Sequence, residues 1–290
     1  MEEIKEISIK DGNYPKLLKE TKKAPKVLYF KGKLSPEENC FAVVGTRRCS
    51  PYGKELAWEI AGNLAEAGLT IVSGLAPGID TVSHSAALEK KRRTIAVLGT
   101  GLDEKSIYPQ SNLKLAEEIL EAGGALVSEY PPGTSGTHFT FPQRNRIVSG
   151  LSLGVLVIEA KEKSGALITA DWARKQKRLV FALPGSVRSL NSRGCHYLIK
   201  QGAKLVENAN DILKELNLNL PIYGINRFDK SDNKEEALIL NILKEGSLDV
   251  DKIIERTKLP APKVASLLTV LEVKGTVRNL GGNIYAISHR

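Results

Sequence analysis

The chain has 290 residues, enough for one large or two ordinary domains that each bury a core. Its 42 Lys and Arg against 33 Asp and Glu give a formal net charge of +9, which permits binding to nucleic acid or another polyanion without proving it. The charged N-terminus is unlike a signal peptide, and no apolar run approaches the roughly 20 residues of a membrane-spanning helix. We therefore expect a cytoplasmic protein without a membrane partner.

The first half of the chain predicts a parallel α/β sheet. Residues 1–39 are lysine-rich and predict a short leader that packs on the main domain. From residue 40 to 216, apolar runs of strand length alternate with helical patterns, which is typical of a doubly wound α/β fold. The apolar runs are FAVV, LTIVS, TIAVLG, ALVSEY, GVLVIEA, LVFALPG and AKLV.

The turn after the first of these runs combines glycine, a hydroxyl and two arginines: Gly45, Thr46, Arg47 and Arg48. A helical pattern resumes at Gly53 and ends near Gly68, so the turn leads into a helix N-terminus, which favours an anion. Arg47 can add a bidentate fork to a phosphate. A surface turn with two solvated arginines explains the same residues, and the turn alone is weak evidence.

Small and hydroxyl residues follow nearly every predicted strand. They are Gly45-Thr46, Ser73-Gly74, Gly99-Thr100-Gly101, Ser128-Glu129, Ser164-Gly165 and Pro184-Gly185-Ser186. Because the carboxyl ends of parallel strands share one edge, we expect these residues to line a single crevice, where open α/β sheets bind ligands. Tight strand-to-helix turns alone account for some of the glycines.

Two of these loops carry further signals. In residues 73–88, Asp80 stands near the start of a helix and is interpreted as an N-cap. In residues 159–175, Ser164 and Gly165 open a helix whose first turn can hold a phosphate. Lys161 and Lys163 lie close by in the sequence and are assigned to the same site.

The loop of residues 138–152 combines basic and aromatic residues. Arg144, Asn145 and Arg146 follow Phe139 and Phe141. Arginine for the phosphates and a ring face for the bases is the pairing that suits a single-stranded nucleic acid. Phenylalanines are more often core residues, and that interpretation stays open for both.

Bound cofactors and metals are disfavoured. Gly99-Thr100-Gly101 lacks the third glycine of a dinucleotide fingerprint, and the sequence has no phosphate-binding P-loop. Three cysteines, Cys40, Cys49 and Cys195, and four histidines show no metal-ligand spacing, so we expect reduced thiols and no metal.

The last part of the chain predicts a separate small domain. A linker is expected at residues 217–233, and residues 234–290 predict three helices and a hairpin across Gly281-Gly282, a winged helix-turn-helix. Its third helix offers only Lys263 near its start to a DNA groove. A protein-contact role stays open beside a DNA-contact role.

Seven motifs in order then give a resemblance. They are VVGTRR with a downstream YG, SGLAPGID with SHSAAL, TIAVLGTGLD with YP, SEYPPG, FPQRNRIVSGLS, VIEA with SGALITA, and FALPGS. Their order and spacing resemble the DprA/Smf family, DNA processing protein A. The resemblance covers roughly residues 13–210, and the C-terminal part is similar to the winged-helix domain that many members append.

The resemblance implies an extended Rossmann-like domain that binds single-stranded DNA, acts as a homodimer, and helps load RecA in natural transformation and homologous recombination. It implies no catalytic residues. The family's binding positions fall on Gly45, Thr46 and Arg47, on Phe141, Arg144 and Asn145, and on Ser164 and Gly165. Two departures are expected: a small N-terminal helical domain that members often carry is missing, and Gln110 stands where members often have a basic residue.

Two other functions compete with this one. Glu129 or Glu159 at a strand end can act as a general acid or base in a nucleotide-processing enzyme similar to phosphoribohydrolases. Either glutamate can instead bind turn amides or pair with Arg144. A double-strand-specific regulator that acts through the C-terminal unit is the third possibility.

Overall fold

The computed structural model describes residues 3–217, 234–243, 246–273 and 276–287. The chain divides into two compact units, residues 1–222 and 223–290, and each is described by itself. The predicted linker at residues 217–233 lies, except for Asn217, outside the described residues.

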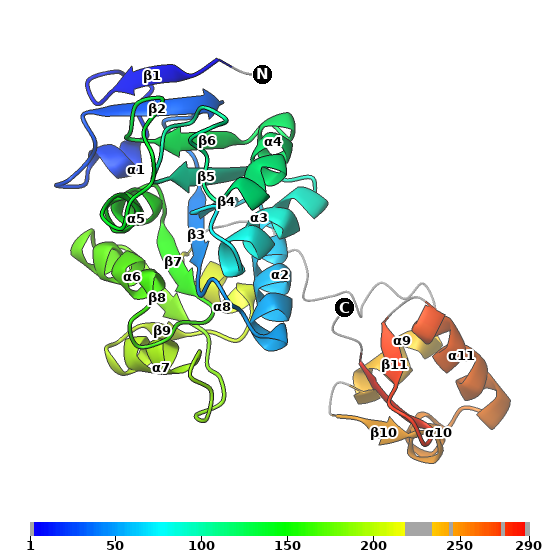
Figure 1. The fold of residues 1–290 in the computed structure, drawn as a ribbon. Coiled ribbons are helices and arrows are strands. Elements are labelled where there is room, and N and C mark those ends of the chain that lie inside the picture. The colour runs from blue at the N-terminus through cyan, green and yellow to red at the C-terminus, as the bar shows by residue number, and fades with distance from the viewer. Residues whose placement is uncertain (1–2, 218–233, 244–245, 274–275, 288–290) are drawn as a thin grey trace. The chain divides into compact units, whose positions relative to one another are not determined.

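A nine-stranded sheet forms the centre of the first unit (Figure 1). Its spatial order is β1-β2-β6-β5-β4-β3-β7-β8-β9, with β3 to β9 parallel and β1 and β2 antiparallel at one edge. The strand order reverses between β3 and β7, which creates the switch point where such sheets bind ligands. The strands are β1 (Lys5–Ser8), β2 (Val27–Gly32), β3 (Cys40–Val44), β4 (Thr70–Ser73), β5 (Thr94–Leu98), β6 (Ala125–Ser128), β7 (Gly154–Val157), β8 (Leu179–Ala182) and β9 (Lys204–Leu205).

Helices cover both faces of this sheet. The first layer holds α1 (Lys16–Lys19), α5 (Thr140–Gly150), α6 (Gly165–Lys175) and α7 (Arg193–Lys200). The second holds α2 (Pro51–Glu66), α3 (Ile79–Glu89), α4 (Leu113–Glu121) and α8 (Ala209–Glu215). A short 3₁₀-helix (Gln110–Asn112) precedes α4.

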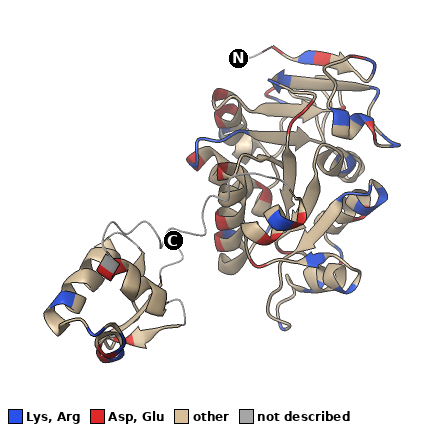
Figure 2. Cartoon of the chain, turned by 180° about the vertical axis from the view of Figure 1, so that it is seen from behind, with Lys and Arg blue, Asp and Glu red and all other residues tan. Residues whose placement is uncertain are grey.

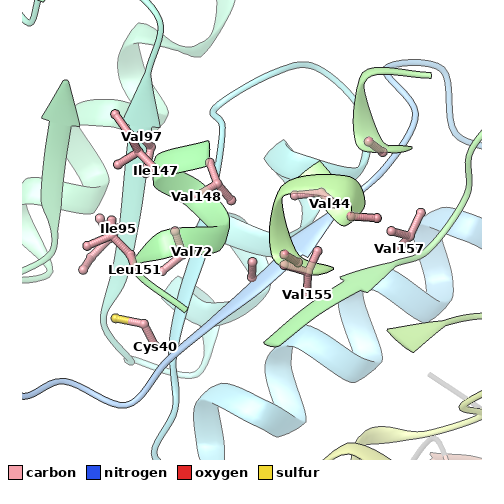
Figure 3. Packing of buried hydrophobic residues seen from close by; sticks show 14 of the residues in the cluster. Cys40, Val44, Val72, Ile95, Val97, Ile147, Val148, Leu151, Val155 and Val157 are labelled. Carbon is pink, nitrogen blue, oxygen red and sulfur yellow. The ribbon is translucent and has the colours of Figure 1, made fainter. Parts of the chain in front are cut away.

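The strands alternate their side chains between the two layers, as the period of a strand requires. In β4, Val72 packs with the first layer and Ile71 with the second. Figure 3 shows Ile147 and Val148 of α5, and Leu151 directly after this helix, against strand residues of the first core. Side chains buried on both faces explain why the strands read as continuous apolar runs.

The sequence-based fold prediction is confirmed. All seven predicted apolar runs form strands, β3 to β9. The first predicted helix begins slightly earlier than expected, at Pro51, because Ser50 caps it by accepting a hydrogen bond from the Gly53 N–H at 3.1 Å. It ends at Glu66, and Gly68 follows with φ +97°, the left-handed conformation that glycine adopts at helix ends.

The N-terminal residues contribute to the sheet itself. Strand β2 pairs with β6, and β1 pairs with β2. Leu28 of β2 is fully buried, and the buried Tyr14 hydroxyl donates to the Pro25 carbonyl at 2.8 Å. The segment expected as a leader therefore supplies two strands and part of the core.

The second unit has its own core. Its elements are α9 (Lys234–Leu243), β10 (Leu248–Asp249), α10 (Val250–Thr257), α11 (Ala261–Val273), β11 (Val277–Asn279) and β12 (Ile284–Ile287). Three helices and the hairpin β11–β12 confirm the predicted winged helix, and Gly281 and Gly282 both have positive φ in the turn. Strand β10, which pairs with β12, was not predicted, since two residues carry no periodicity.

No helix within the described ranges is both long and apolar enough to cross a membrane. The same ranges hold no group of three or more His, Cys, Asp or Glu side chains placed to bind a metal. Cys40, Cys49 and Cys195 are free thiols.

Replacing Leu28 with alanine tests whether the N-terminal strands are integral to the first unit. Deleting a fully buried leucine side chain should lower the free energy of unfolding by about 2–5 kcal/mol. Val27→Ala is the matched control, because Val27 is 36% exposed and should cost roughly 0.5 kcal/mol or less. Denaturant titration of the full chain measures both, and equal small effects would contradict the integral role.

Candidate functional site

Loops from several strands meet at the carboxyl edge of the sheet. The Thr46 N–H donates to the Glu159 carbonyl at 2.8 Å, which joins the loops after β3 and β7. The Ile79 N–H donates to the Thr46 carbonyl at 3.2 Å, and Asn191 Nδ2 donates to the Arg48 carbonyl at 3.2 Å. The predicted convergence of loops on one edge is confirmed.

The N-terminus of α2 already holds an anion, the carboxylate of Glu159. Its Oε2 accepts from the Ser50 N–H at 2.9 Å, and its Oε1 accepts from the Ser50 hydroxyl at 2.7 Å. A Cβ built on Gly53 would lie 2.4 Å from Glu159 Oε2, so the glycine makes room for this carboxylate. An internal carboxylate therefore contacts the N-cap residue of this helix, and phosphate binding at the turn stays a prediction.

Arg47 lies on the surface against an aromatic cluster. Its guanidinium carbon is 5.7 Å from the ring centroid of Phe141, a cation–π contact. The ring of Tyr108 lies 5.6 Å from that of Phe141 at 43°, and Tyr108 is 52% exposed. We call Arg47, Tyr108 and Phe141 the edge cluster. Tyr108 was not predicted as a site residue, although it is the tyrosine of the YP motif.

Glycines make room for the Phe141 ring. A Cβ on Gly99 would lie 2.9 Å from Phe141 Cδ1, and one on Gly136 would lie 2.5 Å from its Cζ. The ring is therefore partly enclosed while Tyr108 and Arg47 remain accessible. The loop after β5 contributes Gly99 as backbone space and not as an anion ligand.

Arg144 is buried, unlike Arg47. It is 5% exposed, and its guanidinium donates to the Val97 carbonyl. A Cβ on Gly74 would lie 2.1 Å from Arg144 Nη1, so the Gly74 backbone covers the guanidinium. Burial lowers the pKa of Arg144 to about 10, while the charge of Asp80 opposes that shift, and the group is charged at neutral pH.

Three predicted contact residues therefore do not fit a direct contact with a ligand. Ser73 is fully buried and its hydroxyl donates to the Val43 carbonyl at 2.7 Å. Gly74 is buried above Arg144, and Arg144 itself faces the interior. Their physical role is to hold the loops after β4 and β5 in place beneath the edge cluster.

Asp80 is not an N-cap, which corrects the prediction. It is the second residue of α3, whose N-cap is Gly78. Its Oδ2 accepts from the N–H groups of Gly74 at 3.1 Å and Ala76 at 3.4 Å. Burial raises the pKa of Asp80, and the charge of Arg144 and these N–H groups offset part of that shift. Gly78 has φ +83°, and a Cβ there would lie 2.4 Å from the Thr46 carbonyl oxygen.

The N-terminus of α6 is open. Ser164 caps it by accepting from the Ala166 N–H at 3.3 Å, and a Cβ on Gly165 would meet nothing within 4 Å. Asn145 Nδ2 donates to the Gly165 carbonyl at 3.1 Å, which ties α5 to this turn. Lys161 and Lys163 are exposed beside it. The predicted helix start is confirmed, and phosphate binding there stays a prediction.

Both candidate catalytic glutamates make internal contacts. Glu129 forms a bidentate pair with Arg146, at 2.5 and 2.7 Å, and not with Arg144. Glu159 is bound by Ser50 and by Asn191 Nδ2 at 3.3 Å. Neither geometry resembles a paired acid and base that face a substrate.

The two helix layers carry opposite charge. Helices α1, α5, α6 and α7 contain eight Lys and Arg and one Asp. Helices α2, α3, α4 and α8 contain ten Asp and Glu and three Lys. In Figure 2, blue segments gather on the side of α1, α6 and α7, and red segments on the opposite helices. We call these the basic and acidic layers.

Three features define the class of this protein. They are an open, mostly parallel sheet with Rossmann-like topology, loops gathered at the carboxyl edge of that sheet, and a winged helix later in the chain. The family model of DNA recombination-mediator protein A matches residues 5–217, and that of the DprA winged helix domain matches residues 229–283. The chain belongs to the DprA/Smf family of DNA-processing proteins.

Individual relatives agree with this assignment. Protein Smf of Escherichia coli is 43% identical over 277 residues, covering 93% of this chain and 74% of that protein. The X-ray structure of DprA from Streptococcus pneumoniae has a TM-score of 0.69 and 45% identity, over 73% of this chain and 74% of that one. A Helicobacter pylori DprA structure, described for its single-stranded DNA binding mode, has a TM-score of 0.66 and 32% identity, over 76% of this chain and 100% of that one.

The buried histidine His84 lies near Arg144 and predicts a pH effect on stability. His84 is fully buried, and its Nδ1 lies 2.7 Å from the Thr94 hydroxyl. Burial and the charge of Arg144 lower the pKa of His84 from 6.5 to about 3. Between pH 6.5 and about 3, His84 is protonated in the unfolded chain and neutral in the folded chain, so the free energy of unfolding falls as the pH drops below 6.5.

Comparing His84→Asn with the parent isolates this effect. Between pH 7 and pH 5 the parent should lose about 2 kcal/mol more of unfolding free energy than the variant. Denaturant titrations at the two pH values measure the difference, and the exposed His138→Asn is the control that should keep the parent's pH dependence. Equal losses in parent and His84→Asn would contradict a buried neutral imidazole.

Proposed function

We propose that this protein binds single-stranded DNA across the carboxyl edge of its sheet, protects the strand, and helps load RecA in DNA uptake and homologous recombination. The edge cluster carries the proposal, because the exposed Arg47 and Tyr108 stand together there with the partly exposed ring of Phe141. Arg47 suits a backbone phosphate, and Tyr108 and Phe141 offer ring faces or edges to bases. The Helicobacter pylori relative described as binding single-stranded DNA supports the same ligand.

The predicted site residues fall into two groups, those on the surface that contact DNA and those beneath that hold them in position. We assign DNA contact to Arg47 and Arg48, to the open turn of Ser164 and Gly165 with Asn145, and to Lys161 and Lys163. Gly45, Thr46, Ser73, Gly74 and Arg144 position these groups from below. Since Glu159 fills the N-terminus of α2, the edge suits a strand that lies across it better than a small anion enclosed in the turn.

A non-catalytic role is part of the same proposal. The carboxylates of Glu129 and Glu159 are committed to Arg146 and Ser50, which supports binding without turnover. Mononucleotides incubated with the protein should therefore release no base, as chromatography can measure. Released base would favour the enzyme hypothesis instead.

RecA loading and a homodimer belong to the proposal as well. The description of the matching family as a recombination mediator supports a recombinase partner. Tyr197 on α7 and Leu205 on the edge strand β9 are 53% and 51% exposed, which supports pairing with a second copy at that edge. Sedimentation tests the dimer, and RecA ATPase activity on coated single strands tests loading.

Arg47→Ala should weaken binding to a labelled oligonucleotide about tenfold, because the variant loses one charged phosphate contact. For this variant, the slope of log affinity against log salt concentration should become shallower by about 0.7. Arg92→Ala is the matched control, since it removes the same charge from an exposed residue in the loop between α3 and β5, at the amino edge of the sheet. Anisotropy titrations at two salt concentrations measure both variants, and parental affinity in Arg47→Ala would refute the assignment.

Removing the winged helix tests which unit binds. Lys263, the lysine near the start of α11, pairs with Glu235 of α9, so that helix offers little free charge to a groove. A chain of residues 1–217, which holds the whole first core, should keep most of the parent's affinity for single strands. Loss of all binding would favour the regulator that acts on duplex DNA through its C-terminal unit.

A further inference from the structure

Trp172 lies on the exposed side of α6 between two lysines. The Nζ atom of Lys23 is 5.3 Å from its ring centroid, and the Nζ atom of Lys175 is 5.1 Å away. Both lysines are exposed and the indole is partly exposed. We call these three residues the tryptophan patch. It lies on the basic layer and includes none of the residues assigned to the edge.

We propose that the tryptophan patch is a second contact for the same DNA strand, at which the indole meets a base and the two lysines meet its flanking phosphates. This inference rests on the proposed function of the carboxyl edge. It extends the binding surface from the edge along the length of α6.

The patch is held in place before any ligand arrives. Lys23 lies in the loop after α1, and its carbonyl accepts from Arg146 Nε at 3.0 Å. Arg146 is in turn fixed by its bidentate pair with Glu129. The backbone that carries Lys23 is therefore anchored to α5, so binding costs less conformational entropy than ordering a free loop would.

The charges around the indole lack partners. Neither Lys23 nor Lys175 makes an ion pair with another described residue. Lys22 is also exposed. Of the acidic residues nearby in the sequence, Glu20 pairs with Arg178 at 3.6 Å, and Asp171 is the one acidic residue within α6. Two ammonium groups near one ring repel each other, and the negative phosphates on either side of a bound base would relieve that repulsion.

The face of α6 connects the patch to the edge. Gly165, Ile168, Trp172 and Lys175 follow one another at helical spacing on one side of the helix. Gly165 opens onto free space and Ile168 is 36% exposed. Seven residues separate Gly165 from Trp172, or about 10 Å at 1.5 Å per residue, which corresponds to about three nucleotides at the spacing of a duplex strand.

A nucleic acid fits these residues better than a membrane does. A single indole with two ammonium groups over its ring places an aromatic surface and positive charge together, the pairing found in single-strand binders. A membrane-binding surface needs a broad apolar face, whereas Trp172 and Ile168 are flanked by Asp171 and Lys175.

Length-dependent binding by the full chain tests the inference. Lys23→Ala/Lys175→Ala should bind an oligothymidylate of about 16 nucleotides roughly tenfold more weakly than the parent and one of about 4 nucleotides equally well. Its salt dependence on the long strand should become shallower by about 1.4, the effect of two phosphates. Lys91→Ala/Arg92→Ala removes two exposed charges from the loop between α3 and β5 and should match the parent on both strands.

Tryptophan emission gives an independent readout. The chain has two tryptophans, and Trp58 lies on α2 in the acidic layer, so Trp58→Phe leaves Trp172 as the sole reporter. The long strand should quench the emission of Trp172 at saturation, and the short strand should not. In a separate affinity measurement, Asp171→Asn should bind the long strand about twofold more tightly, because it removes a negative charge beside the phosphates. Trp172→Phe, which keeps an aromatic side chain, should lose less affinity than Trp172→Ala.

The outcomes separate the two proposals. Unchanged long-strand affinity in Lys23→Ala/Lys175→Ala, or unquenched Trp172 in a complex that Arg47→Ala weakens, would overturn the second contact and leave the edge intact. A parent that binds neither strand would overturn the proposed function itself. Quenching by anionic lipid vesicles with none by the long strand would assign the patch to a membrane and overturn the inference.

Discussion

A buried charge organises the exposed site. The guanidinium of Arg144 lies beneath the backbone of Gly74 and donates to the Val97 carbonyl, with Asp80 as its nearby countercharge. A buried cation is tolerated only with such partners, so the loops after β4 and β5 must stay in register with α5. Phe141 stands one helical turn before Arg144 and is thereby set against Arg47. The buried Arg144 thus helps to fix the position of the Phe141 ring that the exposed Arg47 contacts.

Glu159 complements this arrangement on the other side of the switch point. Its carboxylate neutralises the N-terminus of α2 and its backbone accepts from Thr46, while Asn191 bonds both to it and to the loop of Arg48. An internal anion therefore does what a bound nucleotide phosphate does in other Rossmann-like folds, namely satisfy a helix N-terminus. The positive charge left for a ligand comes from side chains, which can follow an extended polymer across the surface.

Much of the fold followed from the sequence, because strands buried on both faces must be continuous apolar runs and helices must repeat their apolar residues with a period near 3.6. The exposure of the arginines did not follow. Arg47 and Arg144 each stand within two residues of a second arginine, and the backbone of Gly74, distant in the sequence, covers Arg144 while Arg47 stays exposed. Strands β1 and β2 were not predicted, since β1 has four residues with a single apolar side chain, Ile7, and β2 lies within a lysine-rich segment. The capping role of Glu159 depends on a contact across 109 positions, which no local pattern encodes.

The split of charge between the helix layers has a consequence for crowding on a single strand. Copies that approach the polymer through their basic layers all turn their acidic layers outward, away from it. Neighbouring complexes then present like charge to one another and to any duplex nearby, which discourages clumping and strand bridging at low ionic strength. The sheet thus separates a surface that attracts polyanions from one that repels them.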